Sequence, residues 1–541
     1  MKKLAFLLLL VSNLGHAQSK DETNAKVIGN TILQKSIAYE NLRYLCKNIG
    51  NRLSGSKNYD KAVEATAKML KIAGADTVYL EECKVPKWER GAKEEAFVYI
   101  NGVKGKSLNV CALGMSFATP EKGLKAEVIE VKNFDELRAL GASKIQGKIV
   151  FFNYPMKPEL VTGAYGDAAA YRGRGPIEAA KLGAVGVITR SLTHAQDDIP
   201  HTGTTRKPDA GIPEIPAMAI STNDADYLSK LLTEQKNIKT GKLTIPDRLR
   251  PKNALDMPVL AKAQKAEIAN VAFSKDVQLT EIATDNKPVN ETKATGTTPS
   301  RQTTAAGQSK PLNNNSSYTA PEPQTIEIFM KQNCKHYDDV VAHNVIAEIR
   351  GSEFPNEIIV AGGHLDSWDL GEGAHDDGTG VVQAIDVIRT LNLAGLKPKR
   401  TIRVVLFANE ENGLRGGTQF AENARLKNEK IIFAIESDGG GYGCAAIGVT
   451  GTPEQQAKIK QWQPLFYPFG IYDINYDGGG ADINPLKESG TVISGIEPNS
   501  QRYFDLHHTK NDVFEAVNKR ELELGAIGMT LMCWLISEHG I

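Results

Sequence analysis

The chain of 541 residues lacks a long apolar run, an excess of charge of either sign, and closely spaced cysteines. No later segment reaches the roughly 18 uninterrupted apolar residues of a transmembrane helix, so we expect no membrane span. Basic and acidic residues number 64 each, a balance that argues against nucleic acid or an anionic membrane as partner. The six cysteines show no CxxC spacing, and the sequence does not pair them into disulfides.

The N-terminus has the pattern of a signal peptide. Residues 1–17 (MKKLAFLLLLVSNLGHA) combine a basic start, a short apolar run and small residues at Gly15 and Ala17. The alternative is a buried N-terminal helix. We expect cleavage before Gln18 and export to the periplasm or the extracellular medium. The length then predicts two or three domains at roughly 150 residues each.

Composition divides the rest of the chain into four parts. Residues 120–245 form a self-contained block, in which two short β-rich runs enclose a helical segment. Its loop residues His194 and His201 are interpreted as ordinary surface residues. Residues 246–325 include a tract rich in Thr, Asn, Ser and Pro, which predicts a disordered insertion. The remaining parts are residues 18–119 and 326–541.

The C-terminal part alternates strands with helices. Five apolar, β-branched runs are strand candidates, and helical patterns separate or follow them. This alternation predicts an α/β fold with a mixed, mostly parallel sheet and helices on both faces. The strand candidates are HNVIAEIRG, NEIIVAGG, TIRVVLFAN, KIIFAIES and GTVISGIE.

Short acidic and imidazole motifs accompany this strand and helix pattern. Because ligand sites in open α/β sheets lie at the carboxyl ends of the strands, we expect these side chains to converge. Their ordered set predicts a two-metal hydrolase site. The motifs are GGHLDSWD (362–369), GAHDDGTG (373–380), FANEENG (407–413), IESDGGG (435–441) and DLHHTKND (505–512).

The first two motifs supply a metal ligand, a supporting group and a bridging group. His364 and Asp366 lie two residues apart and point to the same face of a strand. His364 can therefore bind a metal while Asp366 holds its second-shell hydrogen bond. Asp376 is placed to bridge two cations. The alternative for Asp376 and Asp377 is simple capping of the next helix.

Glu410 and Glu411 follow a strand and diverge, so one can bind metal while the other faces a metal-held water. The alternative is an exposed acidic turn. Asp438 ends another strand, and the three glycines after it allow close approach of the backbone to a ligand.

The last motif supplies the second imidazole. His508 is the candidate ligand, with Asp512 as an orienting partner, and His507 is interpreted as structural.

One histidine and one carboxylate per metal, with a shared aspartate, suit catalytic zinc. Two cations roughly 3.5–4 Å apart would polarise a carbonyl and lower the pKa of a bridging water. Glu410, left off the metals, would take the proton of that water and pass it to the leaving amine. The sequence leaves zinc, cobalt and manganese open at the second position.

The chain resembles the zinc exopeptidase family of aminopeptidases, and most closely its carboxypeptidase Q branch. The resemblance rests on NIGNRLSGSKNYDKAVE, CKVPKWERG, LGMSFATPEKGLKAEVIEV, HNVIAEIRGSEFPNEIIVAGGHLDSWDLGEGAHDDGTG and GGADINPL. It implies that residues 120–245 are an inserted protease-associated domain acting as a lid, and that residues 18–119 and 326–541 form the catalytic domain. It also allows a homodimer.

The resemblance further implies residue roles. It places His364 and Asp438 on one metal, Glu411 and His508 on the other, Asp376 as the bridge, Glu410 as the general base and Asp366 as the support of His364. It also implies a cis peptide between Asp376 and Asp377.

We therefore expect an exported two-zinc exopeptidase that hydrolyses dipeptides or short peptides from a free terminus. Three alternatives remain open on the same scaffold. One is a single-zinc transferase that cyclises N-terminal glutamine, the second is a non-catalytic receptor, and the third is an endopeptidase or amidase.

Overall fold

The computed structural model describes residues 20–239, 324–475 and 477–541. The expected signal peptide and nearly all of the 246–325 segment lie outside these residues. The described residues up to Thr233 and from Gln324 onward form one unit. Within the described residues, no helix has both the length and the apolar character needed to cross a membrane.

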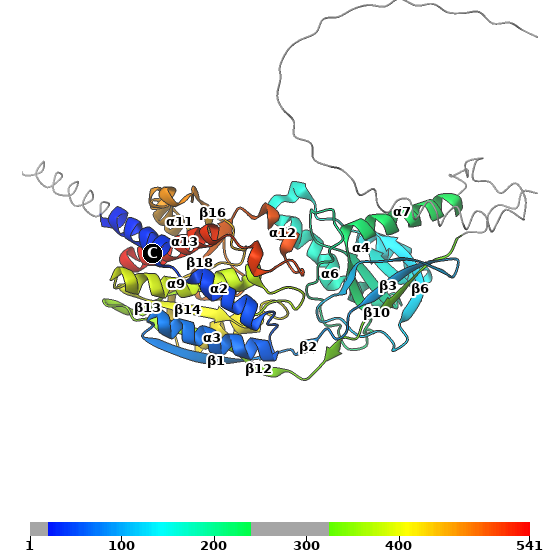
Figure 1. Cartoon of the computed structure of the whole chain (residues 1–541), viewed down its shortest axis with the longest axis horizontal. Helices are drawn as coiled ribbons and strands as arrows, with labels where there is room; N and C mark the ends of the chain where they lie inside the picture. The colour runs from blue at the N-terminus through cyan, green and yellow to red at the C-terminus, as the bar shows by residue number, and fades with distance from the viewer. Residues whose placement is uncertain (1–19, 240–323, 476) are drawn as a thin grey trace, which may run out of the picture. The chain divides into compact units, whose positions relative to one another are not determined.

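The first sheet contains the strands predicted from the C-terminal part of the chain (Figure 1). In its centre β13 pairs parallel with β14 and β15, and β15 pairs parallel with β18. β12 runs antiparallel to β14, so the predicted mixed sheet is confirmed. The order is β1 (Thr77–Val85), β12 (Val340–Ile349), β14 (Arg400–Phe407), β13 (Phe354–His364), β15 (Lys430–Glu436), β18 (Val492–Pro498), β16 (Cys444–Thr450) and β17 (Asp473–Asn475).

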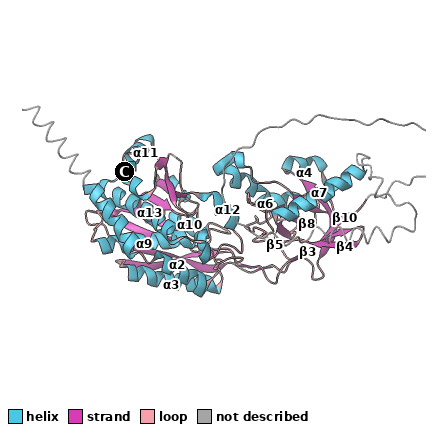
Figure 2. Cartoon of the chain, turned by 45° about the horizontal axis from the view of Figure 1, so that its top comes forward, coloured by secondary structure: helices cyan, strands magenta, loops and turns pink. Residues whose placement is uncertain are grey.

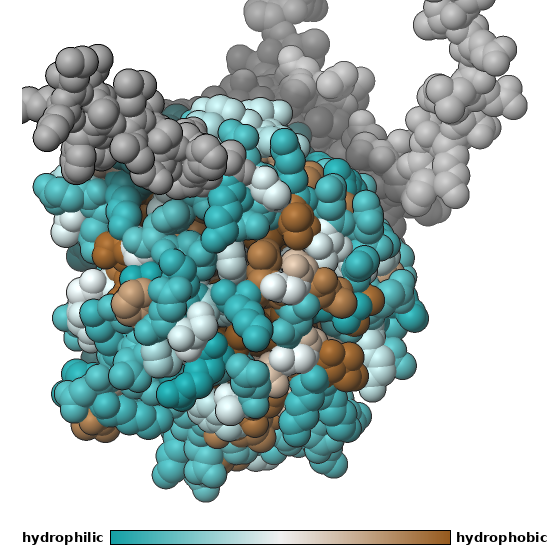
Figure 3. Space-filling model, turned by 90° about the vertical axis from the view of Figure 1, so that its left-hand side faces the viewer, coloured by the Kyte–Doolittle hydropathy of each residue, from teal (hydrophilic) through white to brown (hydrophobic). Residues whose placement is uncertain are grey.

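Helices cover both faces of this sheet, as predicted (Figure 2). One face packs against α3 (Lys57–Ala73), α9 (Thr379–Ala394) and α13 (Lys519–His539). The opposite face packs against α10 (Arg415–Leu426) and η8 (Asn484–Ser489). Each large apolar side chain buried between these layers contributes about 1.5–3 kcal/mol. The outer face seen in Figure 3 is mainly hydrophilic, with scattered apolar residues.

Shorter elements complete this part of the chain. Residues 20–35 are helical. The others are α2 (Ala38–Tyr44), η1 (Leu45–Ile49), η5 (Ala374–Gly378), α11 (Pro453–Lys460), η6 (Gln463–Leu465), η7 (Tyr467–Phe469), η9 (Ser500–Arg502), α12 (Tyr503–Leu506) and η10 (Phe514–Ala516).

A second sheet of eight strands is built around residues 95–331. One face packs against α7 (Thr222–Lys239), and the other packs against α4 (Phe134–Leu140), α5 (Ala142–Ile145) and α6 (Ala164–Ala180). The order is β4 (Val103–Ser107), β3 (Glu95–Ile100), β10 (Ile326–Lys331), β6 (Leu124–Val131), β7 (Ile149–Phe152), β8 (Gly186–Arg190), β9 (Ala217–Ile220) and β5 (Val110–Ala112). β2 (Trp88–Glu89) and β11 (Lys335–His336) form a separate two-stranded ribbon, and η2 (Pro158–Gly163) precedes α6.

This second sheet does not coincide with the predicted 120–245 block. It begins at β3, before residue 120, and it takes its strand β10 from beyond residue 325. β10 lies between β3 and β6, with Phe329 opposite Phe97 and Ile328 opposite Ala126. Composition marks where helices and loops change along the chain, whereas strand pairing joins residues that are far apart in sequence. Helices on both faces make this part α/β rather than simply β-rich.

The buried carboxylate of Asp386 in α9 makes stability depend on pH. Burial raises its pKa to about 6, against an opposing hydrogen bond from Ser36, and its Oδ2 has no hydrogen-bond partner. Because this folded-state pKa exceeds the ordinary value of 3.8, stability falls as pH rises from about 4 to 6 and stays low above that interval. We expect Asp386→Asn to raise the free energy of unfolding on the order of 2 kcal/mol at pH 8, with no gain at pH 4.

Urea unfolding at the two pH values measures this difference. An equal effect of Asp386→Asn at both pH values would show that packing, and not ionisation, governs this position.

Candidate metal centre

Three parallel strands deliver the predicted residues to one edge of the first sheet. In the pairing register His364 at the end of β13 lies opposite Phe407 at the end of β14. Gly362 of β13 lies opposite Glu436 at the end of β15. The turns that follow β14 and β15 carry Glu410, Glu411 and Asp438 to the same edge as His364. The side chain of Asp376, in η5, comes between them.

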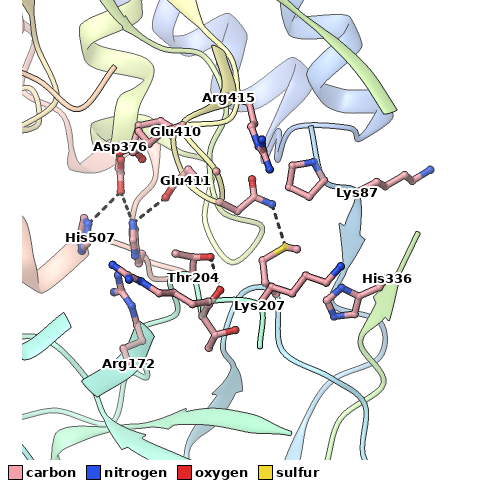
Figure 4. Close-up of a pocket in the computed structure, with 18 of the residues that line it drawn as sticks. Lys87, Arg172, Thr204, Lys207, His336, Asp376, Glu410, Glu411, Arg415 and His507 are labelled. Carbon is pink, nitrogen blue, oxygen red and sulfur yellow. Dashed lines mark hydrogen bonds and ion pairs between the residues drawn. The ribbon is translucent and has the colours of Figure 1, made fainter. Parts of the chain in front are cut away.

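Asp376 presents one carboxylate oxygen to each of two imidazoles. Its Oδ1 lies 3.2 Å from His364 Nε2, and its Oδ2 lies 3.2 Å from His508 Nε2. His364 Nε2 is also 3.3 Å from Asp438 Oδ1, and His508 Nε2 is 3.0 Å from Glu411 Oε2. The structure thus groups the five predicted ligands as two pairs that share Asp376 (Figure 4 shows Asp376, Glu411 and Glu410 along one side of the cleft).

The other ring nitrogen of each histidine faces a backbone carbonyl. His364 Nδ1 lies 3.0 Å from the carbonyl oxygen of Asp366, and His508 Nδ1 lies 3.3 Å from that of Thr202. A carbonyl only accepts hydrogen bonds, so both Nδ1 atoms carry protons. In the neutral ring this leaves the Nε2 lone pair directed at the carboxylates, which is the orientation of a metal ligand. The donor set of imidazole nitrogens and carboxylate oxygens fits zinc.

Burial and mutual charge shift the pKa values of the histidines and carboxylates in this site. Burial acts to lower the pKa of His364, but the carboxylates of Asp438 and Asp376 raise it well above its ordinary value. Burial also acts to lower the pKa of His508, but the charge of Glu411 raises it well above its ordinary value. Burial and then the charge of Asp376 raise the pKa of Glu411 to about 7. Without bound cations these crowded groups hold extra protons, which divalent ions would replace.

Asp377 and His507 also lie close to the predicted metal ligands. Donor atoms of His364, Asp377 and Asp438 lie within 4.8 Å of one another, and so do those of Asp376, His507 and His508.

Asp377 is already engaged by backbone groups. Its Oδ1 accepts a hydrogen bond from Gly380 N–H at 2.9 Å, and its Oδ2 accepts one from His364 N–H at 3.0 Å. The peptide bond between Asp376 and Asp377 is cis, as the resemblance implied.

His507 is closer to the site than its structural interpretation suggests. Its ring stacks on His508 with centroids 3.6 Å apart. Its Nε2 is 3.6 Å from Asp376 Oδ2, farther than the 3.2 Å of His508.

Two predicted supporting contacts are replaced by others. The Asp366 carboxylate is 3.8 Å from His364 Nδ1 and instead accepts a hydrogen bond from Glu410 N–H at 3.1 Å. The support of His364 therefore comes from the Asp366 main chain. Asp512 does not orient His508; it accepts hydrogen bonds from the N–H groups of His375 at 2.6 Å and Asp376 at 3.1 Å. The carboxylates of Asp366 and Asp512 thus hold the backbone of the loops that carry the predicted base and a predicted ligand.

Residues distant in sequence complete the site. A cleft of about 1050 Å³ lies over the metal residues and is also lined by Tyr165 and Arg172. Thr202 donates its N–H to the carbonyl of His508 at 3.0 Å, in addition to accepting from the ring. Sequence reasoning missed these residues because nothing in their local pattern has ligand spacing. The interpretation of His201 as a surface residue is wrong, since it is 2% exposed, whereas His194 is exposed.

Burial also governs the charge of His201. Its burial, and then the nearby His508, lower the pKa of His201 to about 3, so the ring stays neutral. The neutral ring of His201 therefore adds no positive charge beside His508.

Arg52, in the loop before α3, holds the segment that joins β13 to η5. Its fully buried guanidinium donates to the carbonyl oxygens of Leu365 at 2.6 Å, Glu372 at 2.8 Å and Gly373 at 2.9 Å. We expect Arg52→Met to lower the free energy of unfolding by about 3 kcal/mol or more, because carbonyl groups lose their partners inside the protein. Chemical denaturation measures this loss.

Arg43→Met is the matched control, since Arg43 forms an exposed ion pair with Glu40 on the surface of α2. Its expected effect is below about 0.5 kcal/mol. Equal stabilities of the two variants would contradict the role assigned to Arg52.

Comparison with known proteins agrees with this geometry. Residues 344–530 match Peptidase family M28. Carboxypeptidase Q from Mus musculus is 28% identical over 501 residues, which are 93% of this chain and 86% of that protein. Carboxypeptidase Q from Xenopus laevis is 29% identical over the same length, covering 93% and 86% of the two chains.

Solved structures share the fold. A Peptidase M28 precursor from Shewanella amazonensis SB2B superposes with a TM-score of 0.76 and 27% identity, covering 96% of this chain and 97% of that one. A zinc aminopeptidase from Bacillus subtilis superposes with a TM-score of 0.54 and 16% identity, covering 93% and 94%. At that identity the second likeness shows the fold alone.

The fold, the donor set and these matches define the chain as a zinc-dependent metallopeptidase with an M28-type peptidase region. More particularly, it is a zinc exopeptidase related to carboxypeptidase Q.

Proposed function

We propose that this chain is an exported two-zinc exopeptidase that hydrolyses dipeptides or short peptides by removing the N-terminal residue. The observation that carries the proposal is the carboxylate of Asp376, whose two oxygens each lie 3.2 Å from the Nε2 of a different histidine. Each histidine has a further carboxylate of its own. Such a set suits two cations, with Asp376 between them.

The two histidine–carboxylate pairs determine which residues would hold each metal ion. His364 and Asp438 would hold one zinc, Glu411 and His508 the other, and Asp376 both; the second ion could also be cobalt or manganese. When bound, the two ions supply Lewis acidity at the scissile carbonyl and lower the pKa of a water molecule.

Glu410 lines the same cleft and has no close imidazole partner, so it is the group left to move protons. Burial, and then the charges of Asp438 and Glu411 against an opposing effect of His364, raise its pKa well above the ordinary value. Glu410 takes a proton from the attacking water as the carbon–oxygen bond forms. It delivers that proton to the amide nitrogen as the carbon–nitrogen bond breaks, which releases a neutral amine.

The second sheet would serve as the predicted protease-associated lid, with boundaries set by its strands. Thr202 supports this proposal. It lies in the segment between β8 and β9 of the second sheet, and its carbonyl oxygen accepts a hydrogen bond from the ring of His508. A homodimer and export remain proposals that rest on the resemblance and the N-terminal pattern.

The names of the relatives differ on whether the N-terminal or the C-terminal residue of a longer peptide is removed. The relatives carry the name carboxypeptidase, whereas a structural neighbour is a zinc aminopeptidase. On a dipeptide both modes release the same two amino acids. The alternatives on this scaffold are a single-zinc glutaminyl cyclase, a receptor without turnover, and an endopeptidase or amidase. The complete second ligand pair argues against the first two, and a requirement for a free N-terminus would argue against the third.

Elemental analysis of the purified mature protein, combined with assays of a dipeptide and its N-blocked form, tests the proposal. We expect about two zinc ions per chain and cleavage that requires a free N-terminus. About one zinc ion with a cyclised glutaminyl product would move the protein to the transferase class. Bound metal with no turnover of any peptide would identify a receptor.

A further inference from the structure

Arg172 is a buried guanidinium without an acidic partner. It lies in α6, is only 7% exposed, and donates to the hydroxyl of Tyr165 at 2.8 Å and to the carbonyl of Thr202 at 3.4 Å. Its Nε has no hydrogen-bond partner. Among the described residues, no carboxylate lies within ion-pair distance of Arg172. A buried charge in this state is costly unless a ligand completes it.

Other buried arginines show what Arg172 lacks. Arg90 pairs with Asp369 and Glu94, and Arg403 pairs with Glu348 and Glu429. These two guanidinium groups are neutralised by carboxylates of the protein itself. All three nitrogens of Arg52 donate to backbone carbonyls, whereas Arg172 leaves its Nε without a partner. The unpaired guanidinium of Arg172 lines the cleft over the metal residues.

The guanidinium lies one carbonyl group away from a metal ligand. The same Thr202 oxygen that accepts from Arg172 lies 3.3 Å from Nδ1 of His508. Figure 4 shows Arg172 on the side of the cleft that carries Asp376 and His507. Gly203 makes room for it, because a Cβ at Gly203 would collide with Cζ and Nη1 of Arg172.

The guanidinium of Arg172 lies where the C-terminal carboxylate of a dipeptide would be expected. In a dipeptide only the amide nitrogen and one α-carbon separate the scissile carbonyl from the C-terminal carboxylate. When that carbonyl lies at the metal residues, the carboxylate must lie next to them. A planar guanidinium binds a carboxylate through two parallel hydrogen bonds.

We propose that Arg172 binds the C-terminal carboxylate of a dipeptide substrate and so sets the preference for dipeptides over longer or C-terminally blocked chains. This inference rests on the proposed peptidase function. Four further cations line the same cleft, and none of them forms an ion pair with a described residue. They are Lys87, Arg206, Lys207 and Arg415, and the carboxylates of Glu214 and Asp339 line the cleft with them.

The first test uses the unmodified enzyme and compares a dipeptide with its C-terminal amide. We expect kcat/KM to be at least about 30-fold higher for the free acid, the lower end of the loss caused by breaking a buried charge pair. Equal hydrolysis of the two substrates would overturn the inference while leaving the peptidase function intact. Hydrolysis of neither substrate would instead remove the proposed function.

The second test measures the same ratio in Arg172→Met. We expect the preference for the free acid to fall to about 3-fold or less, with Arg172→Lys in between because it keeps the charge but not the paired hydrogen bonds. Arg174→Met is the matched control, since Arg174 is exposed two residues along the same helix and stacks over Phe134. If Arg172→Met lowers kcat/KM equally for both substrates, Arg172 acts on the reaction centre and the inference is wrong.

Discussion

Replacement of Glu410 by glutamine is expected to lower kcat by about 10²–10⁴-fold, the contribution of a general base, while metal content stays at the wild-type level. Glu410 lines the cleft beside Glu411 and Asp438 but takes no part in the two histidine–carboxylate pairs around Asp376. Glutamine keeps the size of the side chain and removes its ability to take a proton. The loss should therefore appear in turnover and not in metal binding.

Initial rates on a dipeptide, together with zinc analysis of the same samples, separate these two effects. Glu422→Gln is the matched control, because Glu422 is an exposed residue of α10. A fully metallated Glu410→Gln enzyme with near-normal hydrolysis would exclude Glu410 as the base.

Replacement of Asp376 by asparagine is expected to lower activity by at least about 10³-fold, since both metal-dependent effects on the reaction would be lost together. The carboxylate of Asp376 stands between His364 and His508, and asparagine offers only one oxygen and no negative charge. We expect the zinc content of Asp376→Asn to fall at both positions.

His364→Ala is the informative comparison, because it removes a ligand from one pair only. That variant should retain up to about one zinc ion per chain, held by His508 and Glu411. Retention of two zinc ions and full activity by Asp376→Asn would show that Asp376 does not bridge.

The site could be predicted where local sequence determines geometry. Three of the predicted ligand motifs follow strands β13, β14 and β15, and parallel strands bring their carboxyl ends to one edge. Period-two spacing also placed His364 and Asp366 on one face, although the hydrogen bond to the His364 ring comes from the Asp366 main chain. A strand pattern predicts side-chain direction, but it does not distinguish a carboxylate from a carbonyl as the partner.

The contacts that sequence could not predict join distant segments. Thr202 meets His508 across more than 300 positions, and Arg52 reaches the carbonyl of Leu365 across a similar separation. His201 illustrates the same limit, because a polar loop is exposed or buried according to what folds over it. Such pairings depend on the order of strands in both sheets, which hydrophobic periodicity does not determine.

The place of β10 in the second sheet determines how the chain can be divided. β10 lies between β3 and β6, yet on the ribosome it emerges long after both of them. Until residues 326–331 are made, the β3–β4 hairpin has no strand through which to join β6. A recombinant fragment that stops at residue 245 would therefore expose two unpaired strand edges. A contiguous fragment that holds all eight strands must therefore run from β3 to β10, through residues 95–331, and a permuted chain that places β10 beside β3 and β6 would be a shorter alternative.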